Sequence, residues 1–238
     1  MKKIITTTTA TKRILCIAAM IIVLLPTHAQ NRRTVSILGD SYSTFRDYVV
    51  PDTNAVWYPS EKRNAKGEGN DVQLVRQTWW QLFLRQTGLR LCQNNSFSGA
   101  TICKTGYRGE DYSNRSYVNR LRYLGSPDII IVFGGTNDTW AKSPLGEFKY
   151  DNWTHQELYQ FRPAMAYMLS ELLDRYPNTD IYIVINDILS KDVTEAMTTI
   201  CQHYGVKYIL LHDIDKQWGH PSQRGMKQIA DQLAEIIK

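Results

Sequence analysis

Short apolar runs alternate with longer amphipathic segments along most of the chain. The short runs have the length and composition of β-strands; they are residues 34–38, 89–93, 128–133, 180–185 and 207–211. The longer segments repeat apolar residues at helical spacing; they are residues 72–86, 115–123, 161–176, 192–204 and the stretch from 222 to the C-terminus. This alternation predicts an α/β fold in which helices cover both faces of a five-stranded parallel sheet.

Two stretches interrupt this rhythm. Residues 46–69 and residues 139–160 are too long for ordinary connections and carry no clear strand or helix pattern. Loops of this length inside a compact domain are often functional or lid-like.

The first 29 residues have the pattern of a secretory signal peptide. Four basic residues precede or begin the apolar run 14–25, and Thr27-His28-Ala29 forms a cleavage-like end before Gln30. The apolar run is short for a membrane anchor, and Cys16 lies near its start, whereas a lipoprotein needs a cysteine at its end. We expect residues 30–238 to form one exported domain, periplasmic or extracellular, with no stable membrane insertion after cleavage.

Charge gives no support for a nucleic-acid partner. Four of the 28 basic residues and none of the 23 acidic ones precede residue 30, which leaves 24 basic against 23 acidic side chains. The mature chain is therefore almost neutral. It keeps Cys92, Cys103 and Cys201, an odd number without metal-ligand spacing. One Cys92–Cys103 disulfide is an alternative, but free thiols are the simpler expectation.

Three polar, glycine-containing segments follow three of the predicted strands. They are Gly39-Asp40-Ser41, the stretch 94–99 that begins with Asn94 and ends with Gly99, and Gly135-Thr136-Asn137-Asp138. Ligands of open parallel sheets bind outside the carboxyl ends of the strands, where these segments would meet. Taken singly, each could be an ordinary strand-to-helix turn.

Taken together, these segments resemble a known family. Gly-Asp-Ser, Asn-x-x-x-x-Gly, Gly-x-Asn-Asp and a late His220-Pro221 occur in the order of the four blocks of the SGNH (GDSL-type) hydrolases. The resemblance spans nearly the whole mature chain. It implies a flavodoxin-like three-layer α/β/α sandwich and an esterase-type acyl transfer.

The resemblance also implies roles for individual residues. Ser41 would be the nucleophile, and its backbone N–H, the N–H of Gly99 and the side-chain amide of Asn137 would form an oxyanion hole. His220, placed before the last predicted helix, would be the general base. His212 is a rival base because it also follows a predicted strand. Asp40 and Asp138 are expected to brace their turns.

The chain departs from the family at the acidic partner of the histidine. That residue usually lies three positions before the histidine, where this chain has Gln217. Asp215 is the nearest candidate and Asp213 the next, and a backbone carbonyl is a third alternative. Because this partner mainly holds the tautomer and orientation of the imidazole, its replacement need not abolish the mechanism.

Other catalytic classes lack their motifs. The sequence contains no Gly-x-Ser-x-Gly, no His-Glu-x-x-His, no Gly-x-x-x-x-Gly-Lys and no Gly-x-Gly-x-x-Gly. These patterns would mark an α/β-hydrolase, a zinc peptidase, a nucleotide hydrolase and a dinucleotide enzyme. The expected mechanism requires no metal and no cofactor.

Tryptophans suggest a substrate class. Trp140 follows Asn137-Asp138, and Trp218 lies two residues before His220, so both are candidate substrate-binding residues. Aromatic faces suit sugar rings, which favours deacylation of an acetylated glycan. A lipase or thioesterase, and an inactive glycan-binding protein of the same fold, are the alternatives. Trp57, Trp79 and Trp80 are expected to pack in the core or to brace loops.

Overall fold

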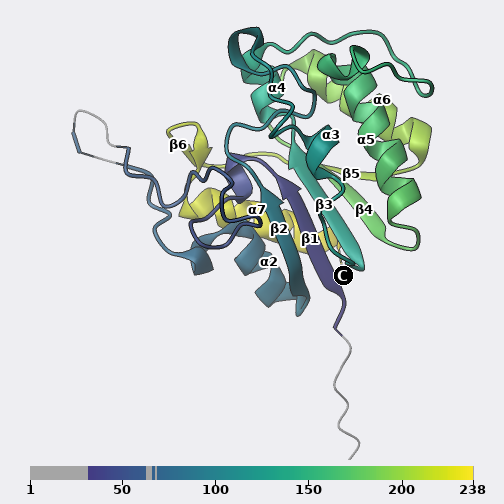
Figure 1. The fold of residues 1–238 in the computed structure, drawn as a ribbon. Helices are drawn as coiled ribbons and strands as arrows, with labels where there is room; N and C mark the ends of the chain where they lie inside the picture. The colour runs from purple at the N-terminus through teal and green to yellow at the C-terminus, as the bar shows by residue number, and fades with distance from the viewer. Residues whose placement is uncertain (1–31, 63–65, 68, 238) are drawn as a thin grey trace, which may run out of the picture. The chain divides into compact units, whose positions relative to one another are not determined.

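A parallel five-stranded sheet forms the centre of the fold. The computed structural model describes residues 32–62, 66–67 and 69–237. The strands are β1 (Thr34–Gly39), β2 (Arg90–Ser96), β3 (Ile129–Gly134), β4 (Asp180–Ile185) and β5 (Lys207–Leu210), in the spatial order β2-β1-β3-β4-β5. All neighbouring strands in this sheet are parallel, so their carboxyl ends share one edge (Figure 1).

Alternating side chains of the central strand feed two hydrophobic cores. In β3, Ile130 and Val132 belong to one core, and Ile129, Ile131 and Phe133 belong to the other. Every residue of this strand is buried. A strand buried on both faces is continuously apolar, which explains why this run of the sequence is the easiest to recognise.

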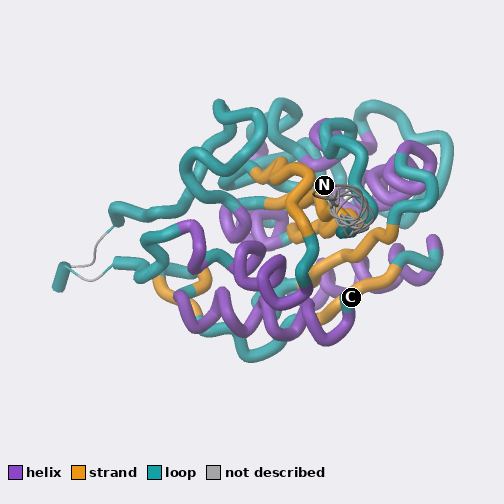
Figure 2. The backbone as a smooth tube through the Cα atoms, turned by 90° about the horizontal axis from the view of Figure 1, so that it is seen from below, coloured by secondary structure: helices purple, strands orange, loops and turns teal. Residues whose placement is uncertain are grey.

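Helices cover both faces of the sheet and confirm the predicted three-layer sandwich. The core on one face includes residues of α2 (Trp79–Thr87) and α7 (Gln223–Ile236). The opposite core includes residues of α3 (Tyr117–Arg120), α5 (Phe161–Arg175) and α6 (Lys191–Tyr204). Figure 2 shows the strands between the two groups of helices. Shorter elements are η1 (Ser41–Ser43), η2 (Val75–Gln77), η3 (Tyr107–Gly109), η4 (Glu157–Tyr159), α4 (Thr136–Ala141), β6 (Lys216–Gln217) and β7 (His220–Pro221).

The strands are confirmed, and three boundaries differ from those predicted by more than two residues. The helix predicted over 72–86 is divided into η2 and α2, and the one predicted over 115–123 shrinks to α3. Strand β2 continues to Ser96, three residues past its predicted end. Its last residues are polar but buried, because the Asn94 side chain donates to the Ser43 carbonyl and the Asn95 side chain to the Tyr123 carbonyl.

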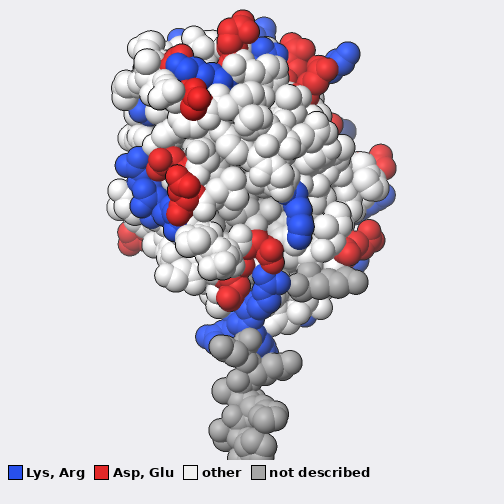
Figure 3. Space-filling view, turned by 90° about the vertical axis from the view of Figure 1, so that its right-hand side faces the viewer, with Lys and Arg blue, Asp and Glu red and all other residues white. Residues whose placement is uncertain are grey.

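Several sequence predictions concern features away from the sheet edge. The signal peptide predicted for residues 1–29 lies outside the described residues. No helix in the described ranges is both long and apolar enough to cross a bilayer. Cys92, Cys103 and Cys201 are free thiols. On the face shown in Figure 3, acidic and basic side chains are interspersed.

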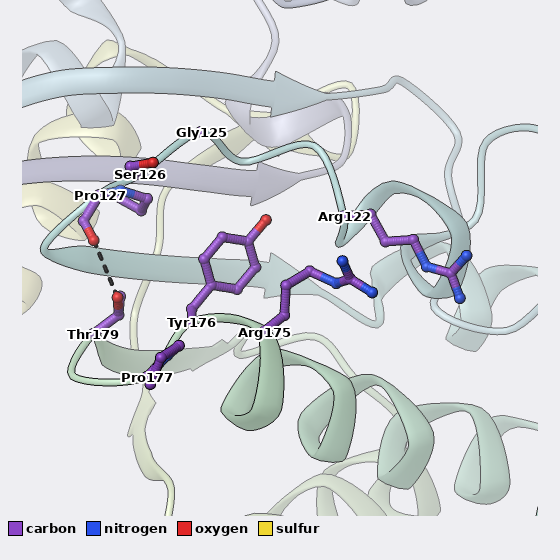
Figure 4. Close-up of a pocket in the computed structure, with 8 residues that line it drawn as sticks. All are labelled: Arg122, Gly125, Ser126, Pro127, Arg175, Tyr176, Pro177 and Thr179. Carbon is purple, nitrogen blue, oxygen red and sulfur yellow. Dashed lines mark hydrogen bonds between the residues drawn. The ribbon is translucent and has the colours of Figure 1, made fainter.

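A surface pocket of about 390 Å³ lies at the amino edge of the sheet. Its walls include Gly125, Ser126 and Pro127, which precede β3, and Pro177 and Thr179, which precede β4. The Thr179 hydroxyl donates to the Pro127 carbonyl across the floor (Figure 4). This pocket lies at the opposite edge from the polar segments that follow the strands.

Candidate active site

Ser41 lies at the carboxyl edge, directly after β1. It begins η1, whose N-cap Asp40 accepts a hydrogen bond from the Tyr42 backbone N–H, and its side chain is buried. The turn requires glycine at position 39, because a Cβ there would lie 2.5 Å from Ser96 Oγ and 2.7 Å from Ser43. The close approach of β1 and β2 thus fixes where the serine is presented.

His220 comes from the other end of the chain and contacts Ser41. Its Nε2 lies 2.9 Å from Ser41 Oγ, and its Nδ1 lies 3.0 Å from the Trp218 backbone oxygen. A carbonyl can only accept, so Nδ1 carries the proton and Nε2 is free to accept the serine proton. This is the arrangement of a nucleophile with an adjacent base.

A two-residue turn aims the Trp218 carbonyl at the imidazole. Strands β6 and β7 pair antiparallel, and Trp218 and Gly219 between them have φ values of 58° and 71°. Positive φ at both positions is typical of a tight hairpin turn, but it is unusual for tryptophan. Two tyrosines hold the hairpin in place: the Tyr42 hydroxyl donates to the Gly219 carbonyl, and the Tyr58 hydroxyl donates to the Pro221 carbonyl.

The structure does not bring Asp215 to His220. The Asp215 carboxylate accepts the Ser222 hydroxyl, and Ser222 caps α7 by accepting the Gly225 N–H. Asp215 is thus occupied at the start of α7, and the prediction that it orients the histidine is wrong. Asp213 is exposed and contacts His212, which is exposed as well. Of the three alternatives, the structure has the backbone carbonyl.

Burial keeps the His220 imidazole neutral. It lowers the pKa of His220 to about 4, and the nearby Lys62 charge adds to this effect, while the Trp218 carbonyl opposes it. A neutral imidazole accepts a proton from a hydroxyl, whereas a protonated one cannot. The histidine is therefore in its basic form at neutral pH.

Aromatic rings surround the imidazole. Trp57 stacks on it with ring centroids 3.6 Å apart and an interplanar angle of 6°. Tyr42 and Trp140 lie farther away and tilted, at 5.3 Å and 5.9 Å. Trp57 is half-buried and packs against the core that includes Trp79 and Trp80, which are fully buried, in line with the prediction for all three; its stacking on His220 was not predicted.

Asn137 presents its amide to the same edge from the start of α4. Its Nδ2 donates to the Ala100 carbonyl at 3.0 Å and lies 3.5 Å from Asp40 Oδ2. The Tyr107 hydroxyl donates to its Oδ1 at 2.8 Å. These partners determine the orientation of the amide. Tyr107 was missed in the sequence because no motif surrounds it.

Gly99 leaves open space beside this amide. Its φ is 80°, and no heavy atom lies within 4 Å of the place where a Cβ would stand. Glycine therefore allows a backbone conformation that other residues rarely adopt and leaves the turn unobstructed. A ligand can approach the turn without meeting a side chain.

Buried charges brace these turns from behind. Burial raises the pKa of Asp40 to about 7 and that of Asp138 to about 6. Asp138 accepts the backbone N–H groups of Ile102 and Cys103. Arg120, which is buried too, donates to the Gly39 carbonyl at 3.0 Å. Both aspartates thus hold turns, as the sequence predicts.

Trp140 and Trp218 remain accessible near the histidine. Their relative exposures are 39% and 46%, and Trp140 also lies 3.6 Å from the position of a Cβ on Gly219. Within residues 32–62, 66–67 and 69–237, no three His, Cys, Asp or Glu side chains are placed to hold a metal ion.

Known structures resemble this one along most of the chain. Proteins of Bacteroides ovatus and Bacteroides uniformis assigned to the GDSL-like lipases are each 52% identical, with TM-scores of 0.84 and 0.83. The alignments cover 87% of this chain and 99% and 96% of those chains. A carbohydrate acetylesterase of Sinorhizobium meliloti shares the fold at 14% identity and a TM-score of 0.56, over 86% of this chain and 97% of its own.

A family model matches nearly the whole of the described domain. No similar protein was found among curated protein sequences. The family model for GDSL-like lipase/acylhydrolase matches residues 33–237, a range that contains the sheet, Ser41 and His220. The chain therefore belongs to the GDSL-like lipase/acylhydrolases, a family of ester-hydrolysing enzymes.

Proposed function

We propose that this protein is an exported serine esterase in which Ser41 and His220 act as a dyad. The observation that carries the proposal is the 2.9 Å contact between Ser41 Oγ and His220 Nε2. In the first step Oγ attacks the ester carbonyl while Nε2 takes its proton, and the same proton then goes to the leaving alcohol. In the second step water, activated by Nε2, hydrolyses the acyl-serine.

The negative charge that develops on the carbonyl oxygen needs hydrogen-bond donors. We assign this role to the backbone N–H groups of Ser41 and Gly99 and to the Asn137 side chain. The open space at Gly99 and the fixed orientation of the Asn137 amide support the assignment. Each such donor typically contributes about 100- to 1,000-fold in rate.

The orienting partner of the base is the Trp218 carbonyl. It accepts the Nδ1 proton of His220 and thereby selects the tautomer that leaves Nε2 unprotonated. A neutral carbonyl supplies this orientation without the negative charge of a carboxylate. The mechanism therefore needs no acidic third residue.

The substrate that we propose is a short acyl ester, most simply an acetyl ester, on a carbohydrate. The exposed Trp140 ring lies beside His220, and the exposed Trp218 precedes it by two residues; aromatic faces of this kind stack on sugar rings. The Sinorhizobium meliloti neighbour is a carbohydrate acetylesterase. Export is supported by the signal-like pattern of residues 1–29.

Hydrolysis of p-nitrophenyl acetate and butyrate by the chain starting at Gln30 tests the proposal. We expect acetate to be preferred, and Ser41→Ala and His220→Ala each to lose about 1,000-fold or more in kcat. His212→Ala is the matched control, because His212 is exposed and contacts Asp213 rather than Ser41, and this variant is expected to retain wild-type activity.

The alternatives predict other results. Activity that survives Ser41→Ala would exclude the assigned nucleophile, and a preference for butyrate or longer chains would favour a lipase or thioesterase. If the wild-type protein hydrolyses neither ester but binds glycan as tightly as Ser41→Ala does, the protein is a non-catalytic binding protein.

A further inference from the structure

Trp57 is the residue at the site that the proposed reaction leaves without a role. It comes from the 46–69 stretch that interrupts the strand and helix rhythm, and it lies face to face with the His220 imidazole at 3.6 Å. This close parallel contact covers one face of the proposed base. The following argument rests on the proposed function of Ser41 and His220.

The backbone around Trp57 is held in place on both sides. The Trp57 N–H donates to Thr44 Oγ1 at 2.8 Å, and the Arg46 N–H donates to the Tyr58 carbonyl at 2.8 Å. The Tyr58 hydroxyl in turn donates to the Pro221 carbonyl, next to the histidine. The loop and the β6-β7 hairpin are thus joined, so the backbone that carries the indole is fixed relative to His220.

The indole N–H is buried and finds no hydrogen-bond partner within the described ranges. A buried donor without a partner opposes folding and calls for an explanation. The contact with the imidazole is such an explanation. Proteins leave a buried polar group without a partner mainly where function requires the position of its side chain.

The dyad lacks two contributions that a carboxylate makes. A hydrogen bond to a neutral carbonyl is roughly half as strong as one to an ionised group, so the Trp218 carbonyl restrains the ring more weakly. It also lacks the full negative charge that stabilises the imidazolium formed when Ser41 gives up its proton. Another group at the site can add to the restraint and supply the stabilisation.

An aromatic face can supply both contributions. Stacking at van der Waals distance opposes any tilt of the imidazole out of its plane. The face of an indole also carries partial negative charge and attracts a cation. Because His220 becomes cationic only during the reaction, this attraction is stronger in the transition state than in the resting enzyme, which is what accelerates a reaction.

We propose that Trp57 is the positioning residue of the base, holding the His220 ring toward Ser41 and stabilising its protonated form in place of a carboxylate. Lys62 modulates this contact. Its Nζ lies 4.5 Å from the centroid of the same indole ring, so a fixed cation competes with the imidazolium for that ring.

Steady-state kinetics of Trp57→Leu and Trp57→Phe on p-nitrophenyl acetate test the proposal. Leucine keeps bulk but has no aromatic face, and we expect its kcat to fall about 3- to 30-fold with KM changed less than about 2-fold. Phenylalanine keeps the face, and we expect it to restore most of kcat. A loss confined to KM, or equal kcat values for the two variants, would overturn the proposal.

The pH profile gives a readout that a general loss of packing would not. Activity requires unprotonated His220, so kcat/KM rises with pH through the pKa of that residue, which burial lowers to about 4 from 6.5. Because the proposed stack stabilises the protonated imidazole, Trp57→Leu is expected to lower the pKa of His220 and to move the acid limb to lower pH, whereas a mere loss of covering would move it toward 6.5. A limb that moves up or stays in place would contradict the electrostatic role of the indole.

Lys62→Gln distinguishes the electrostatic part and leaves the core untouched. Removing the ammonium is expected to move the acid limb to higher pH, opposite to Trp57→Leu, since the Lys62 charge lowers the pKa of His220, and kcat is not expected to fall. A fall in kcat like that of Trp57→Leu would overturn the assigned competition. If Ser41→Ala hydrolyses the ester, the proposed function fails. If Ser41→Ala is inactive but Trp57→Leu keeps the wild-type kcat, only the positioning role of Trp57 is excluded.

Discussion

The two sides of the site are built in different ways. On the side of Asn137, side chains determine the geometry. Buried Asp138 accepts hydrogen bonds from backbone N–H groups, and the Tyr107 hydroxyl donates one to the Asn137 amide. On the side of His220, the imidazole is held by a backbone carbonyl and an aromatic face. One side thus depends on charge and side-chain hydrogen bonds, and the other on chain path and stacking.

This difference teaches where substitutions should act. A position defined by its side chain is lost when that side chain changes, whereas a backbone carbonyl survives every substitution that preserves the turn. We therefore expect the Asn137 side to respond sharply to single polar changes, and the His220 side to tolerate changes of its nearby carboxylates.

The largest effect is expected on the Asn137 side. Asn137→Ala removes a proposed oxyanion donor and should lower kcat about 100- to 1,000-fold. Tyr107→Phe leaves Asn137 Oδ1 without its hydroxyl partner, so the amide is held less firmly, and kcat should fall about 10-fold. Steady-state rates on p-nitrophenyl acetate measure both.

A double-mutant cycle shows whether Tyr107 acts through Asn137. Tyr107→Phe should have almost no effect when Asn137 is already alanine. Independent losses in the double variant would mean that Tyr107 has a separate role. Tyr112→Phe is the control, because its ring neighbours that of Tyr107 at 6.3 Å while its hydroxyl has no assigned part.

A smaller effect on stability is expected from the buried charge behind the serine. Burial raises the pKa of Asp40 from 3.8 to about 7, so the folded state binds this proton more tightly than the unfolded state. The resulting stability is present below about pH 4 and is lost as the pH rises toward 7. Asp40→Asn stays neutral and should gain roughly 5 °C in midpoint relative to wild type between pH 4 and pH 8.

Thermal unfolding over a pH series measures this difference. Asparagine retains an oxygen that can accept the Tyr42 N–H, so the turn itself should be preserved. Asp213→Asn is the matched control, since Asp213 is exposed and its replacement should leave a pH-independent offset. A constant offset for Asp40→Asn as well would contradict the role of burial.

The smallest effect is expected at Asp215. Its carboxylate serves Ser222 at the start of α7 rather than the histidine, so Asp215→Asn should change kcat/KM by less than about 2-fold. Removing the acid of a true triad costs about 10,000-fold. If Asp215→Asn lowered kcat/KM 100-fold or more, the His220 side would also depend on a carboxylate, and the two sides of the site would not differ as described.

The sequence predicts the parts of the site that depend on side-chain identity. Gly39, Ser41, Asn137 and His220 stand at strand ends in a fixed order, and β3 is apolar throughout. It could not predict the Trp218 carbonyl, because every residue has one and only the turn decides where it points. The stack of Trp57 on His220 depends on the path of residues 46–69, which has no periodic pattern, so nothing in the sequence brings the indole to the imidazole.

One predicted helix is longer than the observed one for a related reason. The pattern at 115–123 is helical, but only Tyr117–Arg120 forms α3. Arg120 turns inward to donate to the carbonyls of Gly39 and Asn95, and Leu124 offers its carbonyl to Ser36 of β1. Contacts with distant strands thus override a local preference.

Ser41 and His220 stand 179 residues apart, one after the first strand and the other before the last helix. In the proposed mechanism, the ribosome makes the nucleophile long before the base. Catalysis is therefore withheld until His220 has been made and the β6-β7 hairpin has docked beside Ser41. Turnover thus reports that the two distant segments have met, and a molecule cut short before residue 216 is inert because it lacks the base.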